Sequence, residues 1–169
     1  MPKPDPAELR RFLDSFLYCE EGFLLDEVLD VNTDEQRVHA RLDTQKPLPY
    51  TRLQRSGPHH PPHVAAAEML TLTGSLGCLH AWFFHGVRWD EGWTGFGNRI
   101  HRADFKQLAH VGPPLELHSR ETRTRAGARR VVIRYEFRFE QERRHVYFGD
   151  QTAMFLKQPD LAMDRSGDG

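Results

Sequence analysis

A long apolar segment that begins at Val64 constrains the fold more than any other feature of the chain. Its apolar side chains would fall nearly all round a helix, at Val64, Ala65, Ala66, Ala67, Met69, Leu70, Leu72, Leu76, Cys78, Leu79, Ala81 and Trp82. A helix without a polar face has to be enclosed by other structure. The sequence therefore predicts a central, buried helix, and the rest of the chain has to supply the layer around it.

Alternating apolar and polar residues predict that layer. Two strands joined by a turn are expected first, and four more follow the helix, so that the predicted strands cover residues 23–31, 37–42, 94–105, 115–123, 130–140 and 146–157. Apolar residues at helical spacing predict a short lead-in helix over residues 7–17. Two strands, a helix and four strands are typical of an α+β fold in which one antiparallel sheet wraps around one helix.

Composition bounds the number of domains and the kinds of partner. A chain of 169 residues is expected to form one domain, over residues 1–157, with a flexible polar tail at residues 158–169. Lysine plus arginine number 23 and aspartate plus glutamate 24, so no overall field favours nucleic acid. Two cysteines, the lack of a signal-peptide pattern and the lack of an apolar run of about 20 residues predict a cytoplasmic protein without a membrane span.

The loop before the helix is the best candidate for a functional site. Four prolines at positions 49, 58, 61 and 62 disfavour regular structure there, so His59, His60 and His63 are expected on a stiff loop that leads into the helix. The helix N-terminus is the positive end of the helix dipole, which can polarise a carbonyl group. We expect His63 to act as a general base or as a donor to that carbonyl, and Glu68 to position or activate a water molecule.

This order of elements resembles the hotdog fold. Hotdog proteins act on acyl thioesters of coenzyme A or of acyl carrier protein, usually as dimers with sites at the subunit interface. The spacing of His63 and Glu68 resembles the opening of the central helix in the FcoT-like acyl-thioesterase family, and Tyr18 and Tyr50 fall where that family has tyrosines. The resemblance covers residues 16–157. It implies a homodimeric thioester hydrolase in which both tyrosines contact the thioester.

Departures from that family keep two alternatives open. Ala65 stands where the family has asparagine, and Gly74 and Ser75 stand where it has an Asn-Gln pair, so an amide that would orient the thioester or a water is missing. His59 or His60, followed by two prolines, resembles the His-Phe-Pro loop of hotdog dehydratases, which makes His60 a further catalytic candidate. The alternatives are a lyase that adds or eliminates water or an amine at an enoyl thioester, and a non-catalytic hotdog protein that binds an acyl carrier.

Further candidates lie along the helix and in the strands. Thr71 matches the helix position at which dehydratases carry an acid, and with Ser75, one turn further on, it is a candidate for substrate contact. The segment 92–97 is expected to line an acyl tunnel or a dimer contact. Arginines at a predicted hairpin tip could hold the phosphates of coenzyme A or the acidic surface of a carrier protein, namely Arg120, Arg123, Arg125, Arg129 and Arg130.

No metal ion or cofactor is predicted. Adjacent histidines such as His59 and His60 on a proline-stiffened loop seldom both point inward, and a zinc or iron site needs about three convergent ligands. If the Glu68 carboxylate activates water, Glu68→Gln is expected to lower turnover by about 10²-fold with stability little altered.

Overall fold

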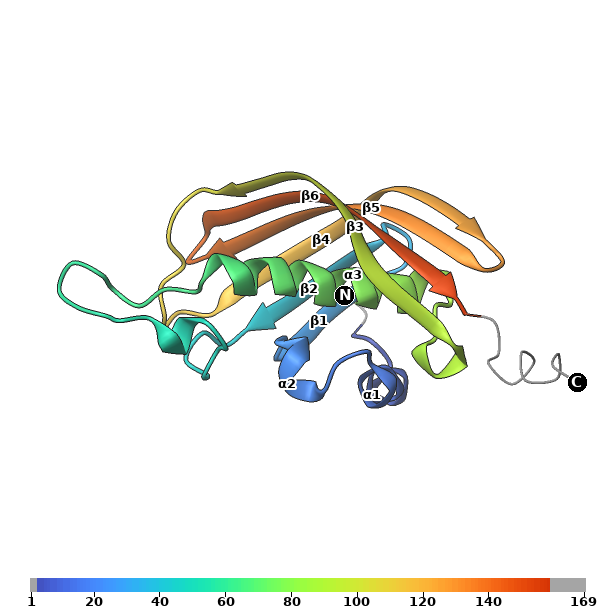
Figure 1. Ribbon diagram of the computed structural model, residues 1–169, viewed down its shortest axis with the longest axis horizontal. Helices are drawn as coiled ribbons and strands as arrows, with labels where there is room; N and C mark the ends of the chain where they lie inside the picture. Colours follow the sequence, from blue (N-terminus) through green and yellow to red (C-terminus); the bar gives the residue numbers. More distant parts are fainter. Residues whose placement is uncertain (1–2, 159–169) are drawn as a thin grey trace, which may run out of the picture.

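The computed structural model describes residues 3–158, which form one antiparallel sheet curved over one long helix, α3 (Ala66–His85) (Figure 1). The strand order is β1-β2-β4-β5-β6-β3, and all neighbouring strands are antiparallel. The six strands are β1 (Glu27–Asn32), β2 (Arg37–Leu42), β3 (Trp93–Phe105), β4 (Leu115–Gly127), β5 (Arg130–Gln141) and β6 (Arg144–Lys157). The prediction of an α+β fold with a sheet around a helix is confirmed.

Four short helices accompany the sheet and α3, and some of them cover part of the side of α3 that the sheet leaves open. They are α1 (Pro6–Ser15), α2 (Glu20–Phe23), η1 (Thr51–Leu53) and η2 (Trp89–Glu91). The Asp5 side chain caps α1 by accepting a hydrogen bond from the N–H of Ala7 at 3.0 Å, and Pro6 suits the first helical position. The lead-in helix therefore exists but ends at Ser15, two residues before its predicted end. The predicted tail, beyond residue 158, lies outside the described residues.

The predicted strand at residues 23–31 is wrong over its first part. Phe23 ends α2, Leu24 adopts the left-handed conformation with φ 64°, and the strand starts only at Glu27. Phe23, Leu24 and Leu25 are buried in succession. An apolar run can be buried in a turn as well as in a strand, so the run alone did not distinguish the two.

The core lies between α3 and the concave face of the sheet. Leu72, Leu76, Leu79 and Trp82 of α3 are fully buried. They face the inward residues of the sheet, which include Leu117, Ile133, Phe137, Phe139 and Phe155. One strip of α3 stays uncovered, because Thr71 and Gly74 are exposed and Cys78 is half-buried. The helix is central as predicted, but it is not enclosed all round.

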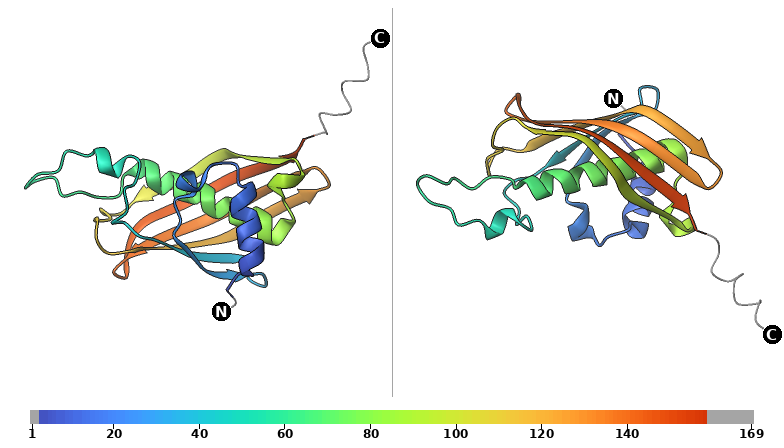
Figure 2. Two further views of the ribbon diagram at one scale, coloured as in Figure 1. Left: turned by 90° about the horizontal axis from the view of Figure 1, so that it is seen from below. Right: turned by 45° about the horizontal axis from the view of Figure 1, so that its top comes forward.

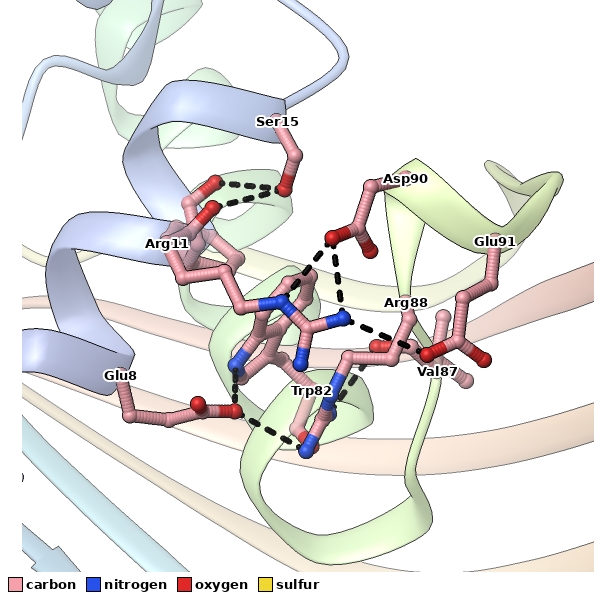
Figure 3. A network of polar contacts seen from close by, with 9 residues as sticks. Glu8, Arg11, Ser15, Trp82, Val87, Arg88, Asp90 and Glu91 are labelled. Carbon is pink, nitrogen blue, oxygen red and sulfur yellow. Dashed lines mark hydrogen bonds and ion pairs between the residues drawn. The ribbon is translucent and has the colours of Figure 1, made fainter.

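Helix α1 lies over the C-terminal half of α3 (Figure 2). An aromatic cluster and several ion pairs hold it there. The Phe12 and Trp82 rings meet edge to face at 5.4 Å. The Glu8 carboxylate accepts a hydrogen bond from the Trp82 indole at 2.8 Å and pairs with Arg88 at 3.0 Å (Figure 3). Arg11 pairs with Asp90 at 2.9 Å on the other side. No helix within residues 3–158 is long and apolar enough to cross a membrane.

Candidate functional site

Glu68 lies in the first turn of α3, and its carboxylate is buried and fully occupied. One oxygen, Oε1, accepts hydrogen bonds from the backbone N–H groups of Tyr50 at 2.7 Å and Thr51 at 2.8 Å. The other, Oε2, accepts from the Thr51 hydroxyl at 2.9 Å and from the N–H of Ala65 at 2.8 Å. Only 1% of Glu68 is exposed. Four donors use the lone pairs of the carboxylate, so its geometry is that of a residue that positions the loop against the helix rather than one that activates water.

His63 is oriented by the loop that Glu68 holds in place. Its Nδ1 lies 3.1 Å from the carbonyl oxygen of Pro61, and a carbonyl can only accept, so Nδ1 carries the proton. The other ring nitrogen, Nε2, is then free to accept one. The Gln54 amide fixes the main chain of His63, because Nε2 of Gln54 donates to its carbonyl at 2.7 Å. His63 therefore presents a basic nitrogen in a fixed orientation.

A small cavity of about 370 Å³ brings the three loop histidines together. Its lining consists of Gln54, Arg55, His59, His60, Pro61, His63 and Leu108. The loop between η1 and α3 projects from the body of the molecule (Figures 1 and 2). The backbone N–H of Tyr50 donates to the Glu68 carboxylate, whereas the residue as a whole is 57% exposed. Within residues 3–158, no three side chains of the His, Cys, Asp or Glu type are grouped so as to hold a metal ion.

A larger cavity, of about 640 Å³, runs along the uncovered strip of α3. Its walls come from α3, from strands β3, β5 and β6, and from the segment that joins α1 to α2. Most of the lining is apolar, and includes Phe16, Leu17, Leu70, Phe96, Tyr135, Phe137 and Phe155. Gly95, Phe96 and Gly97 come from the segment for which the sequence predicts an acyl tunnel or a dimer contact. The cavity is shaped for a long apolar group.

Three predicted substrate-contact residues line this larger cavity, namely Tyr18, Thr71 and Ser75. The hydroxyl protons of two of them are already engaged, since Thr71 donates to the carbonyl of Ala67 at 3.0 Å and Ser75 to that of Phe23 at 2.6 Å. These hydroxyls can still accept a hydrogen bond. The structure thus splits the predicted site into two groups, the histidines at the helix mouth and the hydroxyls beside the apolar cavity.

Sequence reasoning missed Gln151 of β6, which also lines the larger cavity. Its Oε1 lies 3.0 Å from the Thr73 hydroxyl, and its amide nitrogen donates to the Tyr147 hydroxyl at 3.0 Å. The alternation in β6 could have found it, because Gln151 occupies an inward position between Gly149 and Ala153. Among the described residues, the lining of this cavity contains no histidine, aspartate or glutamate.

A buried network of titratable groups was also missed. Glu121 of β4 accepts hydrogen bonds from His80 Nδ1 at 3.1 Å, from His85 Nε2 at 2.8 Å and from the Thr124 hydroxyl at 2.7 Å. Burial opposes ionisation of Glu121, but these hydrogen bonds outweigh it and hold the pKa of its carboxyl at about 2. Burial lowers the pKa of His80.

The network is packed behind the wall of the larger cavity. The Tyr135 ring, which lines that cavity, lies 5.2 Å from the His80 ring, and His80 is fully buried. Two signals in the sequence could have indicated it: a histidine within the apolar helix, and Glu121 at an inward position two residues after Ser119. Its lack of exposure gives it a structural role.

Arg120 and Arg123 lie on the outer face of the sheet. Their neighbours Ser119, Glu121 and Thr124 form the inward network with His80, so alternation turns the two arginines outward. Arg120 is in mid-strand and pairs with Glu136, with Nε to Oε2 at 2.8 Å. The prediction that Arg120 sits at a hairpin tip is wrong, because β4 extends to Gly127. Neither arginine lines the cavity along α3.

Comparison with solved structures identifies the fold. A mutant thioesterase from Pseudomonas aeruginosa matches with a TM-score of 0.60 and 15% identity, over 93% of this chain and 97% of the other. A thioesterase from Haemophilus influenzae matches with a TM-score of 0.56 and 15% identity, over 88% and 90%. The dehydratase heterocomplex ApeI:P from Xenorhabdus doucetiae matches with a TM-score of 0.60 and 13% identity, over 93% and 95%.

The chain therefore has the hotdog fold, as the sequence predicts. No protein-family model matches the sequence, and no curated protein does. The resemblance to the FcoT-like family stays a prediction.

Proposed function

We propose that this hotdog chain is an enzyme that hydrolyses medium or long acyl thioesters. The observation that carries the proposal is the apolar cavity of about 640 Å³ along α3. Its size falls in the range of small-molecule sites, roughly 300–1,000 Å³. The thioesterases and the dehydratase that share the fold support thioester chemistry as the general class. Coenzyme A and acyl carrier protein are both candidate carriers of the acyl group.

His63 is the proposed general base. Its free Nε2 would take a proton from water as the water oxygen adds to the thioester carbonyl carbon. The carbon–sulfur bond would then break, and the proton would pass from the imidazolium to the leaving sulfur, which releases an acid and a thiol. The N-terminus of α3 would polarise the carbonyl group. His60, in the same small cavity as His63, is the second imidazole available. Glu68 acts as a positioning residue, because it holds residues 50 and 51 to the helix.

A second copy of the chain would complete the site. The edge strand β3 has a strand neighbour, β6, on one side only. Phe96 and Ile100 on this strand are 45% and 54% exposed. The open backbone groups of a long edge strand favour pairing with another chain. We propose a homodimer that pairs at β3, closes the cavity over α3 and supplies further groups to a lining in which residues 3–158 place no histidine or carboxylate.

A mass-resolved assay tests the reaction. The protein is incubated separately with acyl thioesters and with enoyl thioesters of coenzyme A and of carrier protein. Free acid with free thiol supports hydrolysis. An intact thioester with an acyl mass altered by water or amine would replace the proposal with the lyase alternative. His63→Ala is the test variant, and His145→Ala is its control, because His145 is exposed, lies outside β3 and lines neither the small cavity at the helix mouth nor the cavity along α3.

One observation favours a second candidate function, a non-catalytic acyl-binding subunit. The described lining of the large cavity has no histidine, aspartate or glutamate, and Glu68 is fully occupied by structural hydrogen bonds. Such a protein would gain thermal stability from an acyl thioester by linkage and yet leave it intact after long incubation. Turnover that His63→Ala abolishes would exclude this candidate.

A further inference from the structure

The outer face of the sheet carries three arginines without a carboxylate partner. Arg123, Arg125 and Arg130 lie on the long β4–β5 hairpin, and each of them is exposed. Arg120 and Arg134, further along the same strands, pair with Glu136 and Asp150. Within residues 3–158, Arg123, Arg125 and Arg130 form no ion pair with a carboxylate. Their charges are available to a partner outside the described chain.

Apolar side chains continue the rows in which these arginines lie. Arg125 is the cross-strand partner of Val132, Val132 of Met154, and Met154 of Phe96. In the next row, Arg130 pairs with Leu156. Cross-strand partners share one face of a sheet, so the arginines and the apolar residues lie side by side on the outer face. Val132, Met154 and Leu156 are only half-buried. The result is an amphipathic surface with its positive part on β4 and at the start of β5 and its apolar part on β5 and β6.

We propose that this surface, formed by Arg123, Arg125, Arg130, Val132, Met154 and Leu156, docks an acidic amphipathic helix of a partner protein. Arginines two residues apart on one strand are separated by about 7 Å. Carboxylates four residues apart on a helix are separated by about 6 Å, so the two patterns can align. An apolar stripe beside the carboxylates would cover Val132, Met154 and Leu156. Guanidinium groups are well suited to carboxylate partners.

Two other ligand classes fit the surface less well. A small polyanion such as coenzyme A needs a concave site, and the outer-face cavity of about 690 Å³ includes Arg120 but none of Arg123, Arg125 and Arg130. Nucleic acid favours a continuous basic surface. Here Glu136 and Asp150 border the arginines, and Val132, Met154 and Leu156 interrupt the basic surface. A protein surface with both charge and apolar area matches what is present.

The surface leads to the edge of the large cavity. The row that starts at Arg125 ends at Phe96, which lines that cavity, three strand spacings or about 14 Å away. A protein docked on the outer face would therefore lie beside the cavity edge, which suits delivery of a tethered acyl group. That last role rests on the proposed function. Docking itself requires no thioester chemistry, so a binding measurement can fail or succeed independently of the enzyme assay.

The experiment uses a designed helical peptide with glutamates at four-residue spacing beside a leucine stripe, and its counterpart in which every glutamate is glutamine. Binding to the full chain is measured by fluorescence anisotropy at low and high salt. The test variant is R123E/R125E/R130E. Its control is R52E/R143E/R144E, which changes the net charge equally at exposed arginines away from the surface. Unfolding midpoints establish that both variants are folded, and Arg125→Ala is the milder substitute.

We expect the affinity of the acidic peptide for the test variant to be at least tenfold lower than its affinity for the wild type. Its affinity for the control variant should stay within about twofold of that for the wild type. Salt should weaken binding to the wild type because the contacts are between exposed charges. Met154→Gln should weaken binding severalfold at either salt concentration, through the apolar stripe. Equal binding of the glutamine peptide, or equal binding to the test variant, would overturn the proposal. So would tighter, Arg125-dependent binding of coenzyme A or of a DNA duplex.

Discussion

Glu68 and Thr51 are joined at two points although 17 residues separate them: the carboxylate accepts both the backbone N–H of Thr51, at 2.8 Å, and its hydroxyl, at 2.9 Å. Glu68→Gln would place an amide N–H₂ among four donors and leave some of them without an acceptor. We expect the variant to lose about 2–4 kcal/mol of unfolding free energy. Urea denaturation measures this loss, with Glu35→Gln, an exposed position, as the control.

The burial of Glu68 changes the effect that we expect of Glu68→Gln. From the sequence alone, Glu68→Gln should leave stability little altered and lower turnover. The structure predicts a stability loss first, followed by any loss of activity that a displaced loop causes. Full stability combined with a loss of turnover of about 10²-fold would return Glu68 to the role of a catalytic acid or base.

His63→Ala should act in the opposite way. The ring is half-exposed, and its hydrogen bond among the described residues is to the Pro61 carbonyl, so its removal should change the unfolding free energy by less than about 1 kcal/mol. If Nε2 is the general base, kcat for thioester hydrolysis should fall by about 10²-fold or more. Steady-state kinetics of this variant and of the control His145→Ala measures the effect. Wild-type kcat in the folded variant would remove His63 from the mechanism.

The sequence predicted most of the fold because local patterns matched the final environment. Val131, Ile133, Tyr135, Phe137 and Phe139 alternate inward, and β5 was placed to within one residue. Residues 124–127 show no such alternation, since the distal part of β4 has no core beneath it, and the strand was predicted to end too early. Strand pairing with β5 extends it to Gly127.

The candidate site was predicted less well because its contacts are remote in sequence. No local pattern could show that Glu68 binds the backbone of residues 50 and 51, or that His80 meets Glu121. The uncovered strip of α3 was missed for a related reason. Small residues such as Gly74 and Cys78 are typical of buried helix positions, whereas here they line a cavity.

Acid should destabilise the protein through the buried network. The pKa of Glu121 lies at about 2, below its ordinary value of 4.5, so the stability it contributes is complete above pH 4.5 and is lost as the pH falls from 4.5 towards 2. Burial lowers the pKa of His80 from 6.5, so the unfolded chain takes up that proton first and stability also falls below pH 6.5. We expect Glu121→Gln to cost about 3 kcal/mol at pH 7, because the charge is lost and one of the two oxygens that accept from His80, His85 and Thr124 is replaced by an N–H₂ donor.

Other carboxylates titrate in the same range, so the informative quantity is the difference between wild type and Glu121→Gln. Urea denaturation at a series of pH values should show this difference shrinking between pH 5 and pH 2. A difference that stays constant over this range would mean that the network does not hold Glu121 in its charged form.

Two glycines beside the large cavity should respond in opposite directions. A Cβ at Gly74 would meet nothing within 4 Å, so Gly74→Ala should stabilise α3 by about 0.5–1 kcal/mol. At Gly95 a Cβ would lie 2.6 Å from the Phe155 ring, so Gly95→Ala should destabilise by about 1–3 kcal/mol. Gly74→Leu would fill the cavity, and KM should then rise more for long acyl thioesters than for short ones. An equal change for both would show that the acyl chain lies elsewhere.

The exposed edge of β3 should decide the oligomeric state. Ile100 is 54% exposed on an edge strand, and a charge placed there would be buried without a partner if a second copy pairs with that edge. We expect the wild type to sediment as a dimer and Ile100→Asp to sediment as a folded monomer. Leu53→Asp is the matched control, because Leu53 is 71% exposed in η1 and away from β3. A dimer that persists in Ile100→Asp would place the interface elsewhere.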